Sequence, residues 1–218
     1  MTTTIKTNPH RAVDYSESGV KKALEAAGSL EAEVKYDGVR LNLPVFPTGE
    51  TQWLSRESKE LPALQHLKSE HGSPTELTNC GDWRWFLKQA GYEGTGLMID
   101  GEVMVKGVDF NTSSGLIRTK YRDFKNHEFS VGGTPTDRKS RKELFNLKPE
   151  YIQVVVYGVI DLNVILDPKA EGPIHSVTRL KAEAIVPLIQ KYFPEIDWVL
   201  SESHTVYDLE SLNSLYEE

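Results

Sequence analysis

The pattern of apolar and polar positions predicts helices and strands in mixed order along the chain. Apolar residues three or four apart predict a helix over 16–27 and a long helix over 176–192, in which Pro187 forces a kink or a new turn. From Val39 the apolar residues alternate instead, which indicates a half-buried strand whose partner runs over 51–55. Further strands are expected over 97–106, 151–160 and 199–206, with short helices after Asp82 and Asp208.

The order of these elements shows no steady strand–helix–strand rhythm. We therefore expect an α+β fold with mixed, largely antiparallel sheets and flanking helices. Trp83 and Trp85 are expected to pack inside it.

Composition narrows the class of protein. The chain has 218 residues, of which 39% are hydrophobic and 26% charged, and this excludes a disordered tail, a collagen-like fibre and a disulfide scaffold. One cysteine, Cys80, cannot form an intrachain disulfide. No apolar run approaches the roughly 20 residues of a membrane helix, and no signal peptide is visible. We expect a soluble cytoplasmic protein without a membrane partner.

Charge is distributed unevenly. The net charge of −7 excludes a uniformly basic surface for nucleic acid, and after Lys191 every charged residue is acidic. Between Arg118 and Glu143, however, eight basic residues stand against four acidic ones. This segment is either a solvated loop or a local phosphate-binding patch. Its basic residues are Arg118, Lys120, Arg122, Lys125, Arg138, Lys139, Arg141 and Lys142.

Two clusters of ionisable residues interrupt the apolar pattern. Glu33, Lys35 and Asp37 would share one face of an extended segment, where they form either an ordinary surface ladder or a site. Asp100-Gly101-Glu102 lies inside an apolar strand, where charges are costly unless they are paired or bind something. With a basic residue such as Arg56, the two clusters could hold a phosphorylated ligand.

The stretch Lys35-Tyr36-Asp37-Gly38-Val39-Arg40 matches the Lys-x-Asp-Gly-x-Arg motif of nucleotidyl transfer. Asp100-Gly101-Glu102 and the strand over 151–162 match two further motifs in the same order, and longer matches surround them at 53–56, 101–111 and 192–198. On these residues the chain resembles the small bacteriophage-type ATP-dependent DNA ligases.

The resemblance implies a role for each matching residue. Lys35 would attack the α-phosphate of ATP and form a lysine–AMP adduct, while Glu33 and Asp37 favour its protonated form and need cations to offset them. Arg40 and Glu102 would hold the ribose and Tyr157 would stack on adenine, although Tyr157 by itself resembles a core residue. Arg56, by itself an ordinary surface residue, would contact a phosphate, and Glu33 would contact adenine. A divalent metal, Mg²⁺, is implied with unknown ligands.

The resemblance also implies nicked double-stranded DNA as a partner of a monomeric protein. Phe110–Gly115 and the basic stretch after it are expected to be DNA-facing loops. Binding should be driven by phosphates and fall with salt. The expected contacts are Arg56, Arg118, Lys120, Arg122 and Lys125.

The motifs that follow in complete ligases are not found before Glu218. We therefore expect residues 1–218 to be one adenylation domain, incomplete at its C-terminus and lacking the OB-fold domain. Alone it should bind ATP poorly and should not seal nicks, and a separate C-terminal ligase piece is a candidate partner. Two alternatives are a non-catalytic DNA- or partner-binding remnant and an RNA ligase or capping-type nucleotidyltransferase.

Overall fold

The computed structural model describes residues 4–7, 9, 14–70, 82–133 and 142–217. The chain divides into two compact units. The larger unit comprises Met1–Pro9 and Asp37–Leu200, and the smaller unit comprises His10–Tyr36 and Ser201–Glu218. Each unit is described separately below.

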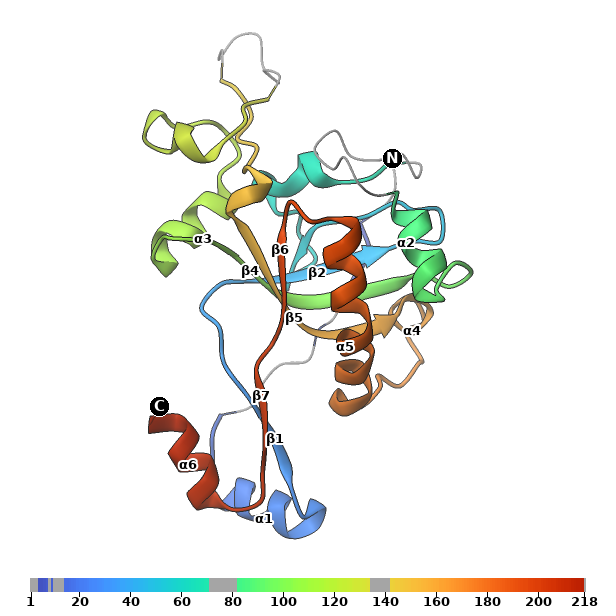
Figure 1. Ribbon diagram of the computed structural model, residues 1–218, viewed down its shortest axis with the longest axis vertical. Helices are drawn as coiled ribbons and strands as arrows, with labels where there is room; N and C mark the ends of the chain where they lie inside the picture. Colours follow the sequence, from blue (N-terminus) through green and yellow to red (C-terminus); the bar gives the residue numbers. More distant parts are fainter. Residues whose placement is uncertain (1–3, 8, 10–13, 71–81, 134–141, 218) are drawn as a thin grey trace. The chain divides into compact units, whose positions relative to one another are not determined.

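The larger unit is built on a five-stranded sheet (Figure 1) with the strand order β3-β2-β4-β5-β6. Three neighbouring pairs are antiparallel, and only β5 and β6 run parallel. The sheet is therefore mixed and largely antiparallel, and together with its helices it confirms the expected α+β class. The strands are β2 (Val39–Val45), β3 (Leu54–Ser55), β4 (Leu97–Val105), β5 (Ile152–Asp161) and β6 (Asp197–Leu200).

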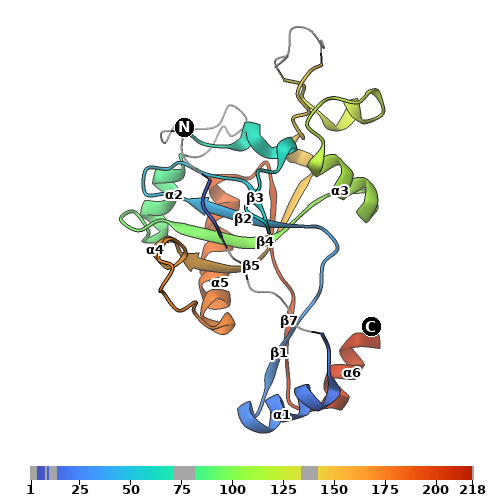
Figure 2. The ribbon, with the colours of Figure 1, turned by 180° about the vertical axis from the view of Figure 1, so that it is seen from behind.

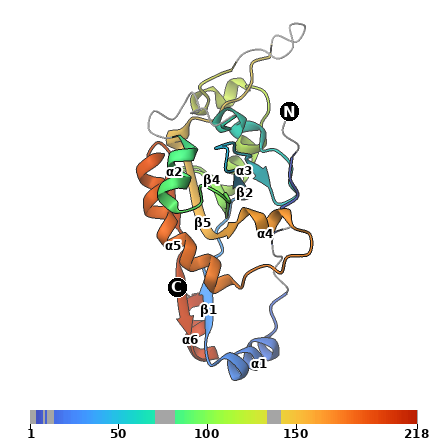
Figure 3. The same cartoon turned by 90° about the vertical axis from the view of Figure 1, so that its right-hand side faces the viewer.

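One face of this sheet carries the hydrophobic core. Alternation directs Leu41 and Leu43 of β2 and Ile99 of β4 into the core, and all three are fully buried. Helix α5 (His175–Tyr192) covers this face (Figure 3) through residues such as Ile185, because one side of the helix is apolar. The core rigidly supports the strands that carry the polar residues discussed below.

The other elements of the larger unit surround the sheet (Figure 2). Helix α2 begins at the cap Asp82 and ends at Gly91, as predicted, and its Trp83 stacks on Phe193 with ring centroids 4.0 Å apart. The elements around the sheet, α2 included, are η1 (Pro62–Leu67), α2 (Trp83–Ala90), α3 (Phe110–Arg118), η2 (Phe124–Phe129), η3 (Pro149–Tyr151) and α4 (Leu162–Leu166), where η denotes a 3₁₀ helix.

The smaller unit pairs two short strands with two helices. Strand β1 (Leu30–Glu33) runs antiparallel to β7 (Ser203–Val206). Helix α1 (Glu17–Ala27) precedes β1, and α6 (Leu209–Glu217) follows β7. The helix expected over 16–27 is confirmed as α1, with Ser16 as its cap and Gly28 ending it in the left-handed conformation, but none of its side chains is buried.

Four sequence-based expectations are corrected. The strand expected over 199–206 is two strands, β6 and β7, which belong to different sheets. Phe110–Gly115, expected to be a loop, is the first part of α3 because Asp109 caps it with hydrogen bonds to two backbone amides. Trp85 is 56% exposed on α2 rather than packed inside. Strand β2 is more than half-buried, since every residue except Arg40 is buried.

Within the part of the chain that the structure describes, no helix combines the length and the apolar character needed to cross a membrane.

Candidate nucleotide-binding site

A polar cluster lies on the three central strands of the larger unit. Arg40 is on β2, and Asp100 and Glu102 are two residues apart on the neighbouring strand β4. In the register of the two strands, Arg40 lies opposite Glu102 and Asn42 lies opposite Asp100. Because side chains two residues apart project from the same face of a strand, the four polar side chains share one face.

Arg40 is bound to Asp100 by two hydrogen bonds. Its Nε donates to Oδ1 at 2.7 Å and its Nη2 donates to Oδ2 at 2.5 Å, which is the bidentate geometry of a strong arginine–carboxylate pair. Burial of the guanidinium acts to lower its pKa, but the hydrogen bonds and charge of Asp100, helped by Glu102, leave the pKa of Arg40 above its usual value. The carboxylate of Asp100 therefore orients the guanidinium.

Asp100 is also held by Asn42, which is held in turn by Thr7. Asn42, which is fully buried, donates from Nδ2 to Asp100 Oδ1 at 2.7 Å. The hydroxyl of Thr7 donates to Asn42 Oδ1 at 2.7 Å, and the backbone N–H of Thr7 donates to the hydroxyl of Ser58 at 2.9 Å. A continuous network thus runs from the N-terminal segment to Arg40. Buried polar groups whose hydrogen-bonding capacity is met in this way keep their side chains in one conformation.

Tyr157 contacts the same cluster from β5. The register pairs Asp100 with Gly158 and Gly101 with Val156, so Tyr157 is an extra residue without an opposite partner. Such a bulge redirects a side chain. The guanidinium carbon of Arg40 lies 5.0 Å from the centroid of the Tyr157 ring, within cation–π range. Tyr157 is half-buried and belongs to this cluster rather than to the core.

The surroundings of Gly38 explain why the Lys-x-Asp-Gly-x-Arg motif has a glycine at this position. A Cβ placed at Gly38 would lie 2.7 Å from Glu102 Cγ and 2.8 Å from the backbone oxygen of Val103. The chain therefore passes too close to β4 for any side chain at this position. The motif glycine brings Arg40 and Glu102 into adjacent strands.

Lys35 and Glu33 belong to the smaller unit. Strand β1 ends at Glu33, so Lys35 and Asp37, expected to share one face of an extended segment with Glu33, lie outside the strand. Two hydrogen bonds join this segment to residues 201–202: the backbone N–H of Val34 donates to Glu202 O at 3.1 Å, and the side-chain hydroxyl of Ser201 donates to Glu33 Oε1 at 3.0 Å. The Lys35 side chain is exposed.

The remaining predicted residues lie on surface elements of the larger unit. Arg56 is exposed in the turn after β3, two residues before Ser58, which adopts a positive φ of 58°. Arg118 is the last residue of α3, and Lys125 lies in η2. Lys120 and Arg122 precede η2, and all four basic side chains are exposed. Arg138, Lys139 and Arg141 lie outside the described residues.

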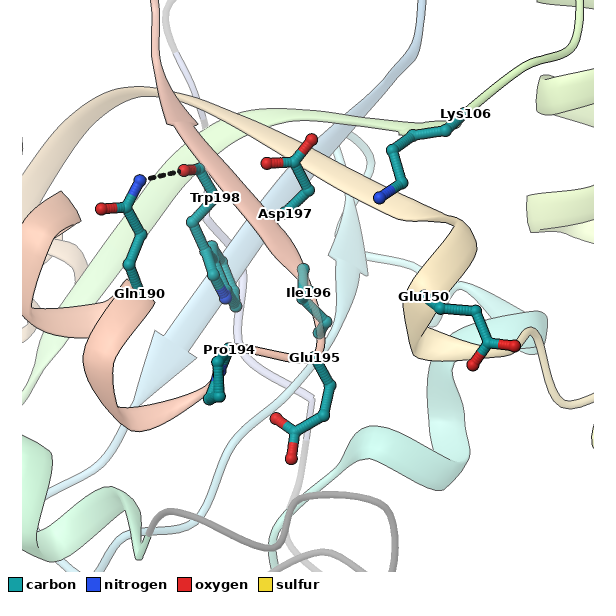
Figure 4. Close-up of a pocket in the computed structure, with 8 residues that line it drawn as sticks. All are labelled: Lys106, Glu150, Gln190, Pro194, Glu195, Ile196, Asp197 and Trp198. Atoms are coloured by element: carbon teal, nitrogen blue, oxygen red, sulfur yellow. Dashed lines mark hydrogen bonds between the residues drawn. The ribbon is translucent and has the colours of Figure 1, made fainter.

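A pocket of about 660 Å³ opens elsewhere in the larger unit (Figure 4). Its lining includes Glu150, Glu195 and Asp197 but only one basic residue, Lys106, so it does not suit the negative charge of a nucleotide. Gln190 closes one side by donating to Trp198 O at 2.7 Å. None of the predicted site residues lines this pocket.

The described residues offer limited means of holding a metal. Among them, no group of three or more His, Cys, Asp or Glu is placed to hold an ion. Asp100, a carboxylate of the polar cluster, is already engaged by Arg40 and Asn42. Mg²⁺ is usually held by one or two carboxylates together with nucleotide phosphates, so the metal stays a prediction.

Sequence reasoning missed Thr7 and Asn42 as members of the site, and it placed Asp100 in a candidate cluster without giving it a role of its own. Asp100 belongs to a quoted motif, and Asn42 follows Arg40 by two residues, so strand periodicity places both on the site face. Thr7 gives no comparable signal, because its contact with Asn42 spans 35 residues.

The polar cluster lies on adjacent strands, and the exposed Lys35 of the same motif precedes it in the sequence. A comparison with protein families gives the class of protein: the family described as the ATP-dependent DNA ligase domain matches residues 12–218, and the chain belongs to this family. It is 44% identical to the DNA ligase of Escherichia phage T7 over 98% of its own length and 58% of that protein. It is 42% identical to the DNA ligase of Enterobacteria phage T3, covering 97% of this chain and 61% of the relative.

A solved structure agrees with the sequence comparison. The structure of the bacteriophage T7 ATP-dependent DNA ligase in complex with ATP matches with a TM-score of 0.81 and 41% identity, over 98% of this chain and 60% of that one. The chain thus spans about three-fifths of the length of the relatives that it matches. The resemblance to phage-type ATP-dependent DNA ligases inferred from the motifs is confirmed.

Proposed function

We propose that the chain carries out the adenylation chemistry of an ATP-dependent DNA ligase, with Lys35 as the nucleophile. The lone pair of Lys35 Nζ attacks the α-phosphorus of ATP, the bond to the bridging oxygen breaks, and pyrophosphate leaves. The amine loses a proton and a phosphoramidate to AMP remains. In the whole ligase reaction, a 5′-phosphate oxygen at a DNA nick then takes the AMP from Lys35, and the 3′-hydroxyl displaces AMP.

The observation that supports this proposal best is the Arg40–Asp100 pair. Its bidentate hydrogen bonds and the contact with Tyr157 orient a cationic group next to an aromatic ring before any ligand binds. Preoriented side chains of this kind can fix the position of a bound nucleotide, and phosphoryl transfer depends on such positioning. Lys35 precedes Arg40 by only five residues in the same motif.

The nucleotide contacts follow from the same cluster. We propose that Arg40 and Glu102 bind the ribose hydroxyls, since they lie opposite each other on β2 and β4. Tyr157, whose ring lies 5.0 Å from the Arg40 guanidinium, would stack on adenine, so that ribose and base meet neighbouring side chains. Arg56 would bind a phosphate of the nucleotide or of the nick, and Glu33 would contact adenine.

DNA binding would depend on exposed basic residues of the larger unit. Arg118, Lys120, Arg122 and Lys125 are close in sequence and exposed, so they can contact phosphates of nicked duplex DNA. Arg122 is paired with Glu143 at 3.1 Å, so a phosphate would have to replace that carboxylate. Substitution of Arg118, Lys120 or Lys125 should weaken binding and reduce the salt dependence by about one counterion.

Adenylation is tested with the 218-residue chain and α-labelled ATP in the presence of Mg²⁺. We expect a covalent protein band that Lys35→Ala abolishes and that Lys22→Ala, an exposed lysine of the same smaller unit, leaves unchanged. Mass spectrometry of tryptic peptides should place AMP on Lys35.

Each other result has a clear meaning. AMP on another residue, or a band that survives Lys35→Ala, contradicts the proposal. Labelling by GTP in preference to ATP would indicate a capping-type enzyme, and preference for nicked RNA would indicate an RNA ligase. No band together with binding of nicked DNA would identify a non-catalytic module.

A further inference from the structure

A projecting arm in the larger unit contains residues 119–133 and 142–148. The arm extends outward next to α3 (Figure 1), where its described residues are drawn in yellow-green and yellow. Two of its segments pair through backbone bonds, because Arg122 N–H donates to Glu143 O at 2.8 Å and Phe145 N–H donates to Lys120 O at 3.0 Å. A second bridge joins Ser130 to Leu147 at the base. The arm therefore has a defined backbone.

Two aromatic residues at the ends of η2 face different surroundings. Phe129 packs edge-on against Tyr151, with ring centroids 5.1 Å apart, and anchors η2 to the larger unit. Phe124 is 87% exposed, the highest value among the exposed large hydrophobic residues that the structure describes. One exposed aromatic residue is common on protein surfaces, so its meaning depends on how it is held and on its neighbours.

Phe124 is held in place rather than merely exposed. Its ring stacks on His127 with centroids 5.4 Å apart and planes 27° apart. The backbone oxygen of Phe124 is hydrogen-bonded to His127 Nδ1 at 2.6 Å, and Asp123 caps the start of η2 by accepting from Lys125 N–H. A preoriented ring loses little conformational freedom when it meets a partner.

The charge around Phe124 specifies the kind of partner. Lys125 follows it directly, and the ammonium groups of Lys120 and Lys142 both lie within 6 Å of the Tyr121 ring, at 5.6 and 5.8 Å. The described part of the arm contains three acidic residues: Asp123 caps η2, Glu143 pairs with Arg122 at 3.1 Å, and Glu128 is exposed in η2. Cations interleaved with aromatic rings form a surface that complements phosphates and bases together.

We propose that Phe124 is a non-ionic DNA contact at the end of the arm, where its ring stacks on a base or sugar while the surrounding lysines and arginines bind phosphates. The proposal rests on the proposed function, because it takes nicked duplex DNA as the partner. Apolar side chains inserted at base steps are used by proteins that bend or open duplex DNA. A nick interrupts one strand and makes such insertion easier.

The test separates stacking from charge by measuring binding at several salt concentrations. Fluorescence anisotropy of a labelled, singly nicked duplex is followed with the 218-residue chain at rising KCl. We expect Phe124→Ala to weaken binding about tenfold at every concentration without changing the salt slope. Lys125→Ala should instead reduce the slope by about one. Phe124→Tyr should bind like the unchanged chain.

Trp85→Ala serves as the matched control. Trp85 is an exposed aromatic residue of the same unit with a cation close to it, since Lys88 Nζ lies 5.1 Å from its ring centroid, but it lies on α2 outside the arm. Its removal should leave DNA binding unchanged. Equal losses for Phe124→Ala and Trp85→Ala would overturn the proposal.

Three further results would overturn the inference: unchanged affinity in Phe124→Ala, a loss that appears only through a smaller salt slope, or no DNA binding by the unchanged chain. Covalent labelling of Lys35 by ATP is measured on the same preparations. Labelling that persists in Phe124→Ala shows that the variant is folded. Because labelling and DNA binding are measured separately, a failure of the Phe124 inference can be told apart from a failure of the proposed adenylation.

Discussion

Arg40 shows how one residue of the motif is prepared for a ligand by the rest of the larger unit. Its charge is balanced by Asp100, its guanidinium lies next to Tyr157, and Asp100 is held in turn by Asn42. Each contact comes from a different position on three adjacent strands. The geometry of the site is therefore a property of the sheet, although the recognisable motif is only six residues long.

Gly38→Ala tests whether close packing of the chain explains the motif glycine. The new Cβ would collide with Glu102 Cγ and the Val103 oxygen, so we expect a loss of about 1–3 kcal/mol in the free energy of unfolding. Lys35 labelling by ATP should fall as well. Gly115→Ala is the control, since no atom lies within 4 Å of its added Cβ, and it should be neutral or stabilising in α3. Urea denaturation measures both changes.

At the scale of elements, β2, β4 and β5 are connected by side chains as well as by backbone bonds. The Arg40–Asp100–Asn42 network crosses from β2 to β4, and the bulge at Tyr157 adds β5. Such a network is costly to break because the remaining polar groups stay partly buried.

Asp100→Ala should therefore destabilise the larger unit by about 2–4 kcal/mol in urea denaturation. The substitution leaves the half-buried Arg40 charge without its carboxylate, and Asn42 Nδ2 keeps only its longer hydrogen bond to Leu41 O. Glu57→Ala breaks an exposed pair with Lys59 and should change stability by less than about 0.5 kcal/mol. Equal effects of the two substitutions would show that the network adds nothing.

The elements differ in how well sequence predicted them. Helix α1 and helix α2 carry their own start and stop signals in Ser16, Gly28, Asp82 and Gly91, and both agree with the prediction. The prediction of one strand over 199–206 was wrong, because local alternation cannot reveal that β6 and β7 pair with different partners.

The candidate site was predictable where residues follow the strand period, and unpredictable where distant segments meet. Periodicity placed Arg40 and Glu102 on strands, and the family motif selected them. Thr7 could not be found, since no local pattern signals a contact with Asn42. The bulge at Tyr157 was equally invisible, because it is defined only by the register of β5 against β4.

At the scale of the whole molecule, the two units differ in their content of buried side chains. The larger unit holds nearly all of the buried hydrophobic residues. In the described part of the smaller unit, the buried residues are one hydrophobic residue, Val206, and one polar residue, Ser201. Local stability follows buried contacts, so the unit that carries Lys35 is expected to open more easily.

Hydrogen–deuterium exchange tests this difference. Amides of β1 and β7 should exchange at least about tenfold faster than those of β4 and β5, because the latter form the centre of the five-stranded sheet. Saturating ATP should slow exchange around Lys35 if the adduct forms. Uniform protection across both sheets would show that the two units unfold as one.

The anchoring of Thr7 has a practical consequence for anyone who modifies this protein. The main-chain amide of Thr7 is bonded to Ser58 and its hydroxyl to Asn42. Three hydrogen bonds in sequence connect Thr7 to Arg40 through Asn42 and Asp100. An affinity tag or a trimmed start near this threonine would loosen the guanidinium from a distance, and the resulting poor labelling could be mistaken for a defect in the nucleophile itself. Tags are better attached at the other terminus.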